Sequence, residues 1–489
     1  MAVSDLQPEP DQTLVEAVME MIRQRIATRS LTPGARVPSL RRLAGTLGVS
    51  KSTAVEAYDR LVAEGTITAR PGSGFFVTRR TRPFSLAPRA PRADQTIDPL
   101  WIMRQSLDLG GGVPKPGCGW LPSHWLPDTA LRRAMRGLAR DTSADLAEYD
   151  SLLGFPPLRR HLADRLDGRG IEAGPDRILL TDSGTQAIDL VCRFLLQPGD
   201  TVLLDDPCYF NFQAILRAHR VTVACVPYTP NGPDLEGFAR AAAEHRPRLY
   251  LTNATLHNPT GASLPAASVH RLLKIAEAHD MVVVEDDIFA DFETEPAPRL
   301  AAFDGLERVI HIGSFSKTLS AALRCGFVAA RPDWIDGMAD LKLATAFGNG
   351  SMAAQLVHRM LIDGSYRRHM DAVRGKLARA MGETARRLRS AGLRLWTEPR
   401  GGMFLWAELP EGIDSTAVAR RALEEGVVLA PGNVFSPSGS AGRFLRFNVA
   451  QCAEPRIFET LGRAMAAPAD VTPPVVLPDR ATDGGTHPG

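Results

Sequence analysis

The sequence predicts an α/β protein with a mostly parallel sheet, preceded by a small module of short helices and a hairpin. Three observations indicate this. From about residue 177, apolar strand-like runs alternate with helical patterns, which is typical of a parallel sheet covered on both faces. Residues 13–77 instead combine helical periodicity with a short hairpin pattern. Between the two parts, residues 79–99 are rich in Arg, Pro and Ala and lack periodicity, as expected of a semi-rigid linker.

Size and composition fit a chain of two or three domains. The 489 residues are 44% hydrophobic and 23% charged, with a net charge of +2, and suffice to bury a core. The six cysteines are scattered without metal-ligand spacing, so we expect a reduced, cytoplasmic chain and no metal site. No signal-like N-terminus and no apolar run of bilayer length is found, so neither secretion nor membrane insertion is expected.

Residues 1–78 are predicted to form a helix-turn-helix with a hairpin. Apolar residues at helical spacing predict a helix over 13–29. Ser39 is placed to cap a helix at 40–47, and Ser50 to cap the next helix, with a glycine turn between them. Residues 66–69 and 75–77 then alternate as a hairpin. In such a motif, the second helix presents its first turn to the DNA major groove.

The charge of this region is uneven. Residues 1–92 carry 14 Lys or Arg against 8 Asp or Glu, and no acid lies between Glu20 and Glu56. A polyanion is the natural partner of such a block, although charge alone is equally consistent with a solvated helix face.

The sequence of this module closely resembles the GntR-type winged helix-turn-helix. The matching stretches are V-P-S-L-R-R-L-A, G-V-S-K-S-T, A-Y-D-R-L-V-A-E-G and R-P-G-S-G-F-F-V. The resemblance implies binding to double-stranded DNA through Arg41, Lys51, Ser52, Thr53, Gly72 and Ser73. Val55 departs from the pattern, because many members carry an arginine there. A purely structural or protein-binding module is the alternative, and the acid-free basic block disfavours it.

In the second part, polar motifs follow the ends of successive apolar runs. The runs are 178–180, 202–204, 221–223, 249–251, 282–284 and 309–312. Ligands of parallel sheets bind at the carboxyl ends of the strands. The motifs there are 181–186, 205–209, 257–261, 285–287 and 314–317. Each alone has an ordinary explanation as a cap, a turn or a core aromatic residue.

Taken together, these motifs suit an aldehyde cofactor that carries a phosphate. Lys317 has a primary amine beside Ser314 and Ser316, with Arg324 seven residues later, as a Schiff-base lysine requires. The hydroxyl-bearing turn at 181–186 opens a helix and could hold a phosphate. Asp286 could keep a pyridine nitrogen protonated, so that the ring accepts electrons.

This constellation resembles the class I branch of the fold-type-I aminotransferases that use pyridoxal 5'-phosphate, over roughly 350 residues. The resemblance implies that Lys317 forms the Schiff base and shuttles the α-proton. It implies that the phosphate is held by Ser183, Gly184, Thr185, Ser314 and Arg324, with Tyr149 of the partner subunit. Tyr209 would stack on the ring, Asn258 would meet the ring oxygen, and Asp286 would pair with the ring nitrogen. Arg446 would bind a substrate carboxylate.

One residue departs from this pattern. Three residues after the Asp286 position, these aminotransferases usually carry a tyrosine whose hydroxyl bonds the cofactor oxygen, and this chain has Phe289. Without this phenol, we expect the aldimine pKa to rise and turnover to slow. Cofactor binding is predicted, but efficient transamination is not.

A GntR-type winged helix joined to an aminotransferase-like domain resembles the MocR family. Asp98–Ser106 and Pro116–Pro122 are similar to its YdcR-like branch. The implied organisation is a winged helix at 1–78, a linker at 79–99, and an aminotransferase-like domain at 100–466, with its large part at about 145–340 and its small part at 341–466. A disordered tail is expected at 467–489.

Two functions follow from this resemblance. The first is a homodimeric transcriptional regulator that senses an amino-acid-like compound by aldimine exchange at Lys317. The second is a working aminotransferase with an accessory DNA-binding head. The residues permit both, because the two functions share their first chemical step.

Overall fold

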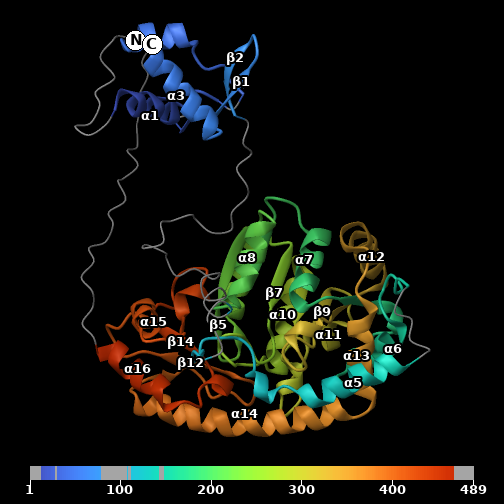
Figure 1. The fold of residues 1–489 in the computed structure, drawn as a ribbon. Helices are drawn as coiled ribbons and strands as arrows, with labels where there is room; N and C mark the ends of the chain where they lie inside the picture. Colours follow the sequence, from blue (N-terminus) through green and yellow to red (C-terminus); the bar gives the residue numbers. More distant parts are fainter. Residues whose placement is uncertain are drawn as a thin grey trace, which may run out of the picture. The chain divides into compact units, whose positions relative to one another are not determined.

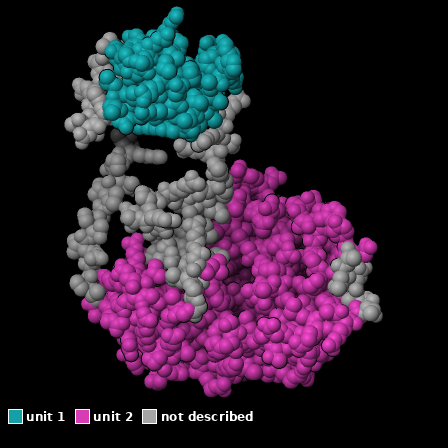
Figure 2. Space-filling view, viewed as in Figure 1, with its two compact units in different colours: residues 1–85 teal, residues 86–489 magenta. Residues whose placement is uncertain are grey.

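The computed structural model describes residues 13–27, 30–32, 34–78, 107, 112–141 and 148–466. The chain divides into two compact units, residues 1–85 and 86–489 (Figure 2). The expected linker at 79–99, the stretch Asp98–Ser106 and the expected tail at 467–489 lie outside the described residues. Each unit is described by itself below.

The first unit is a helix-turn-helix followed by a two-stranded wing, as predicted. Its elements are α1 (Leu14–Ala27), α2 (Leu40–Leu47), α3 (Lys51–Ala63), β1 (Ile67–Arg70) and β2 (Gly74–Val77) (Figure 1). Ser39 accepts a hydrogen bond from the Arg42 amide, and Ser50 accepts one from the Thr53 amide, so both predicted caps are confirmed. Gly48 ends α2 in the left-handed conformation at φ 67°, where glycine has no steric penalty.

The second unit is built on an eight-stranded sheet. Its strand order is β3-β10-β9-β8-β7-β4-β5-β6. The strands are β3 (Ile178–Thr181), β4 (Thr201–Asp206), β5 (Thr222–Thr229), β6 (Gly232–Pro233), β7 (Leu249–Thr252), β8 (Val282–Asp286), β9 (Val309–Ser314) and β10 (Gly326–Ala329). Pairing is parallel from β9 through β8, β7 and β4 to β5, while β10 and β6 run antiparallel to their neighbours. The prediction of a mostly parallel α/β sheet is confirmed.

Helices cover both faces of this sheet, because successive residues of its strands point to opposite sides. Leu179 of β3 packs in a core with α7, α8 and α12, while Leu180 packs in a second core with α6, α9 and α10. The helices of this part are α5 (Asp128–Arg140), α6 (Pro156–Asp167), α7 (Gly184–Leu195), α8 (Phe210–Ala218), α9 (Leu235–His245), α10 (Ala266–Ala278), α11 (Leu300–Asp304), α12 (Pro332–Ala346) and α13 (Ser351–Ile362).

The chain then forms a smaller antiparallel sheet with its own helices. The long helix α14 (Ser365–Ser390) leads into it (Figure 1). Its strands, in spatial order, are β11 (Arg394–Leu395), β12 (Phe404–Glu408), β14 (Phe444–Asn448) and β13 (Ala430–Pro431). Helices α15 (Ser415–Glu424) and α16 (Pro455–Ala466) complete this part. The predicted numerical boundary between a large and a small part stays a prediction.

Among the described residues, no helix is both long enough and apolar enough to cross a bilayer.

Candidate functional site

Lys317 lies in the turn that follows β9, and its side chain is half-buried. Burial lowers the pKa of its amine to about 8, and the cationic Arg446 and Arg324 act in the same direction. Asp286 opposes this shift. A lysine with such a pKa is partly neutral near pH 7, and the neutral amine is the form that attacks a carbonyl group.

Asp286 is the last residue of β8 and is 1% exposed. Its Oδ1 accepts a bond from the Ile288 amide at 3.3 Å, and the Asn253 side chain donates to its backbone oxygen at 2.9 Å. Burial raises the pKa of its carboxyl to about 7. The ammonium of Lys317 acts in the opposite direction and lowers the pKa of this carboxyl slightly.

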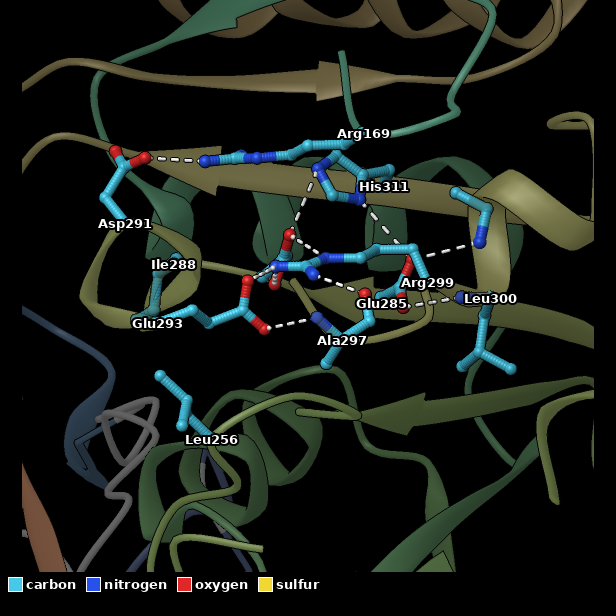
Figure 3. A network of polar contacts seen from close by, with 12 residues as sticks. Arg169, Leu256, Glu285, Ile288, Asp291, Glu293, Ala297, Arg299, Leu300 and His311 are labelled. Carbon is cyan, nitrogen blue, oxygen red and sulfur yellow. Dashed lines mark hydrogen bonds and ion pairs between the residues drawn. The ribbon is translucent and has the colours of Figure 1, made fainter. Parts of the chain in front are cut away.

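Glu285 precedes Asp286 in β8 and points to the opposite face of the sheet, because side chains alternate along a strand. Figure 3 shows the network of polar contacts around Glu285 and Arg299. Glu285 accepts bonds from the Leu300 and Ala301 amides at 2.8 and 3.0 Å. Asp287 pairs with Arg299, whose guanidinium also donates to Glu293 at 2.6 Å. These carboxylates are saturated by partners inside the protein, so they serve the structure and not the site.

A small cradle forms where α7 begins. Ser183 caps this helix and accepts a bond from the Gln186 amide at 3.1 Å. Gly184 is so enclosed that a Cβ there would lie 3.1 Å from Ile288 Cγ2 and 3.7 Å from the Cβ of Ser314. The helix N-terminus and the Ser314 side chain therefore meet, as predicted from the strand ends. Free amides at such a terminus favour an anion.

Two further predicted cradle residues lie at its edge. Thr185 is exposed on the first turn of α7, and Arg324 is exposed beside the start of β10. A Cβ on Gly326, two residues after Arg324, would lie 3.0 Å from the Gly184 amide nitrogen, so this segment runs along the cradle. Within the described part of the chain, the Arg324 guanidinium has no hydrogen-bond or ion-pair partner.

Arg446 and Asn258 contact each other directly. Arg446 lies on β14, is 1% exposed, and donates from Nη1 to Asn258 Oδ1 at 2.8 Å and from Nη2 to the Gly117 carbonyl at 2.6 Å. Its Nε has no partner in the described structure. The rings of Phe404 and Phe435 lie 4.5 and 4.7 Å from its guanidinium carbon.

Burial lowers the pKa of Arg446 to about 10. The guanidinium is thus a buried cation held by neutral acceptors, and a carboxylate would be a stronger partner.

The two predicted tyrosines differ in position. Tyr209 is half-buried at the start of α8, against Phe210 and Phe212, and burial raises its pKa to about 12. The charges of Arg446 and Asp286 contribute smaller and opposite shifts to this pKa. Tyr149 is 81% exposed and contacts Phe347, so one chain does not bring it to the other predicted site residues.

Phe289 is buried behind the site. It packs edge-on against Phe404, with ring centroids 5.3 Å apart, and Phe404 in turn lies against Arg446. Sequence reasoning missed two other contributors. Gly117 supplies the carbonyl that holds Arg446, and a side chain at Gly119 would contact both Arg446 and Lys317. The unusual Gly-Cys-Gly run was the available signal.

The predicted DNA-contacting residues are accessible in the first unit. Arg41, Lys51, Ser52, Gly72 and Ser73 are exposed. Thr53 is half-buried. The Ser52 and Thr53 hydroxyls each lie 2.7 Å from the Ser50 hydroxyl, so both currently share hydrogen bonds with the cap of α3.

Two families match the chain. Residues 121–463 match aminotransferase class I and II, and residues 14–77 match the bacterial regulatory proteins of the gntR family. The chain belongs to the aminotransferase class I and II family, with a gntR-family module fused at its N-terminus. This is the MocR-like architecture that the motifs predicted.

Similar proteins of this family fall into two groups. The Escherichia coli proteins named HTH-type transcriptional regulators YjiR and YdcR are each 29% identical to the chain, which covers 97% and 94% of their lengths. The alignments span 93% and 89% of this chain. The 2-aminoadipate transaminase of Thermus thermophilus is 31% identical over 73% of this chain and 90% of its own.

The solved structures similar to the chain include LysN of Thermus thermophilus, an α-aminoadipate aminotransferase complexed with N-(5'-phosphopyridoxyl)-L-leucine. It aligns with a TM-score of 0.67 and 29% identity, over 74% of this chain and 94% of its own. The fold-type-I aminotransferase fold of the second unit is therefore established.

Proposed function

We propose that the protein is a pyridoxal 5'-phosphate-dependent transcriptional regulator that binds double-stranded DNA and senses an amino compound at Lys317. One observation carries this proposal. An amine of lowered pKa, a buried carboxyl and a buried guanidinium without a carboxylate partner share one site, and the same chain carries a gntR-family module.

The residues present fit the cofactor. Its phosphate would be held by Ser183, Gly184 and Thr185 at the start of α7, with Ser314 and Arg324 beside them. The absence of a side chain at Gly184 keeps this cradle open, because a Cβ there would already contact Ile288 and Ser314. When bound, pyridoxal phosphate supplies an aldehyde that condenses reversibly with primary amines and a ring that accepts negative charge.

Each remaining side chain has a distinct task in this proposal. The Lys317 amine, with its pKa near 8, is the nucleophile and the carrier of the α-proton. Asp286 holds a proton on the ring nitrogen, Asn258 donates to the ring oxygen, and Tyr209 stacks on the ring. Arg446 exchanges its neutral acceptors for the carboxylate of the sensed compound, which is therefore expected to be amino-acid-like.

The first unit would read DNA through its exposed donors. Arg41 lies on α2, Lys51, Ser52 and Thr53 open α3, and Gly72 and Ser73 form the tip of the wing. Arginine and lysine neutralise phosphates, while short hydroxyl side chains reach phosphates or base edges.

A homodimer is part of the proposal. Tyr149 and Phe347 are 81% and 61% exposed and contact each other, so a large aromatic surface is open to solvent. A second copy of the chain would cover it and receive Tyr149 at its own phosphate cradle. We place this dimer in the cytoplasm, where its DNA would be found.

A working aminotransferase is the second candidate. The 31% identity to a protein named 2-aminoadipate transaminase favours it, as does the intact set of Lys317, Asp286 and Arg446. Phe289 weighs against fast turnover, because it lacks the hydroxyl that the family's usual tyrosine supplies.

The test begins with the full chain incubated with pyridoxal phosphate and then freed of excess. We expect an absorbance band near the visible edge that Lys317→Ala abolishes, because this amine is placed to hold the aldehyde. Circular dichroism controls for folding of the variant. A band that survives in Lys317→Ala would contradict the assignment.

A titration then separates the two candidates. Amino acids are added while the absorbance band, the affinity for an operator fragment and the release of keto acid are followed. A regulator changes its band and its DNA affinity without catalytic turnover, whereas an aminotransferase releases keto acid at catalytic rates.

A further inference from the structure

Residues 114–120 run along the smaller sheet and are fixed to it by backbone hydrogen bonds. The Val428 amide donates to the Pro114 carbonyl at 3.0 Å, and the Gly117 amide donates to the Val428 carbonyl at 2.9 Å. The Asn448 amide donates to the Pro116 carbonyl at 2.7 Å. These bonds attach the segment beside β14, the strand that carries Arg446.

Side-chain bonds fix the far end of this segment as well. Asn448 is fully buried, and its Nδ2 donates to the carbonyls of Trp120 at 2.8 Å and Cys118 at 3.2 Å. Gly119 is therefore held from both sides. The hydrogen bonds of its neighbours Cys118 and Trp120 fix the position of Gly119.

The two glycines of the segment are glycine for different reasons. A Cβ on Gly117 would lie 2.5 Å from the Ala430 nitrogen and 2.9 Å from the Val428 oxygen, so backbone packing forbids a side chain there. A Cβ on Gly119 would meet only two atoms within 4 Å, Arg446 Nη2 at 3.8 Å and Lys317 Nζ at 3.9 Å. Both distances are ordinary van der Waals contacts.

Nothing in the fold itself requires glycine at position 119. Its φ lies outside the left-handed region, so an L-residue fits its backbone without strain. Among the described residues other than its chain neighbours, a methyl group there would contact the amine of Lys317 and the guanidinium of Arg446 and no other group. The space that a side chain would fill is thus the space between the two groups that a sensed compound must reach.

We propose that Gly119 is a ligand-contacting residue of the Lys317 and Arg446 site, whose missing side chain leaves room for the body of an amino acid between its amine and its carboxylate. This inference rests on the proposed function. The expected compounds are amino acids whose amine meets Lys317 and whose carboxylate meets Arg446. Gly119, which lies outside the strand-end motifs, lines the space between these two ligand groups.

The proposal makes Gly119→Ala a test of ligand space and not of folding. The added methyl occupies ligand volume, and one carbon of misfit in a binding pocket changes discrimination by about ten- to two-hundredfold. We expect the cofactor band of the full chain to form as in the natural protein. The concentration of the best-responding standard L-amino acid needed to shift that band should rise by roughly tenfold or more.

Gly382→Ala is the matched control. It makes the same chemical change in α14 of the same unit, and a Cβ there meets nothing within 4 Å. We expect it to leave both the band and the amino-acid response unchanged. Thermal unfolding of the cofactor-free variants checks that neither substitution disturbs the fold.

The outcomes separate this inference from the proposed function. If the natural protein forms no band, the proposed function fails. If it forms a band that the standard L-amino acids do not shift, the compound class is wrong and the inference falls with it. If Gly119→Ala responds to the amino acid as the natural protein does, or loses the band itself, Gly119 does not shape the ligand space and the inference is overturned.

Discussion

Three successive carboxylates at the end of strand β8, Glu285, Asp286 and Asp287, lie in opposite situations. Glu285 and Asp287 are enclosed by Arg299, His311 and the first amides of α11 (Figure 3). Between them in sequence, the Asp286 carboxyl accepts the Ile288 amide at 3.3 Å, and burial raises its pKa to about 7. Adjacent residues of one chain thus differ in whether the protein itself satisfies them.

This difference separates structural from functional charge. A buried carboxylate that is surrounded by donors is compatible with a stable fold, but removal of one of its partners lowers the free energy of unfolding. A buried carboxyl with few donors costs stability whenever it ionises, and it gains a partner only when something cationic arrives. The second situation is what a site for a protonated ring nitrogen requires.

Removal of Arg299 should have the largest effect on stability. Arg299→Met leaves Asp287 buried without its cation and takes a donor from Glu293, and breaking such a pair costs about 3–5 kcal/mol. Urea unfolding of the cofactor-free protein measures this loss. The control is Arg331→Met, which breaks an exposed pair with Asp333 and should cost at most about 1 kcal/mol. If the two variants lose the same free energy of unfolding, the network of Figure 3 does not stabilise the fold as proposed.

The effect of Asp286→Asn should depend on pH. Because the folded-state pKa of Asp286 is about 7 and its ordinary value is 3.8, the folded protein binds the extra proton between these values. Its contribution to stability is therefore fully present below pH 4 and is lost as the pH rises through 7. Asp286→Asn should match the natural protein near pH 4 and exceed it by pH 8, by on the order of a few kcal/mol.

Urea unfolding of the cofactor-free protein across pH 4–8 checks this sign. Lys317 titrates near pH 8, at the upper edge of that window, so Asp286→Asn is compared with the natural protein at each pH. The same variant should bind pyridoxal phosphate more weakly. Parallel stability profiles would mean that Asp286 is as well satisfied as its two neighbours.

The smallest effect is expected from Phe289→Tyr. Phe289 is 2% exposed and packs against Phe404, so a new hydroxyl there is buried and costs roughly 1 kcal/mol without a partner. If that hydroxyl meets the cofactor, addition of pyridoxal phosphate should raise the melting temperature of the variant more than that of the natural protein. If the melting temperature of the variant rises no more than that of the natural protein, the side chain at position 289 does not contact the cofactor.

Site residues at strand ends could be predicted from the sequence, whereas their partners in irregular segments could not. Asp286, Asn258 and Lys317 could be predicted because the carboxyl ends of parallel strands meet at one edge, whatever the order of the strands. The alternation of side chains also separates Asp286 from Glu285 and Asp287. Their partner Arg299 could not be predicted, because it lies in an irregular stretch before α11 whose path depends on tertiary packing.

Gly117 and Gly119 were missed for a related reason. They lie outside any helix or strand, and the hydrogen bonds of Gly117 run to Arg446 on β14 and to Val428 before β13, more than 300 residues later. Periodicity describes local structure and carries no information about such a distant contact. The winged helix, by contrast, was predicted nearly element by element, because its caps and turns are local.

The attachment of residues 114–120 to β14 has a mechanical consequence. These residues belong to the first continuous stretch of described chain that follows the winged helix in sequence, and their backbone is bonded to the sheet that carries Arg446. Because these bonds join the segment to β14 at several points, any displacement of β14 would displace residues 114–120 as well. The segment and the strand that carries Arg446 therefore act mechanically as one piece.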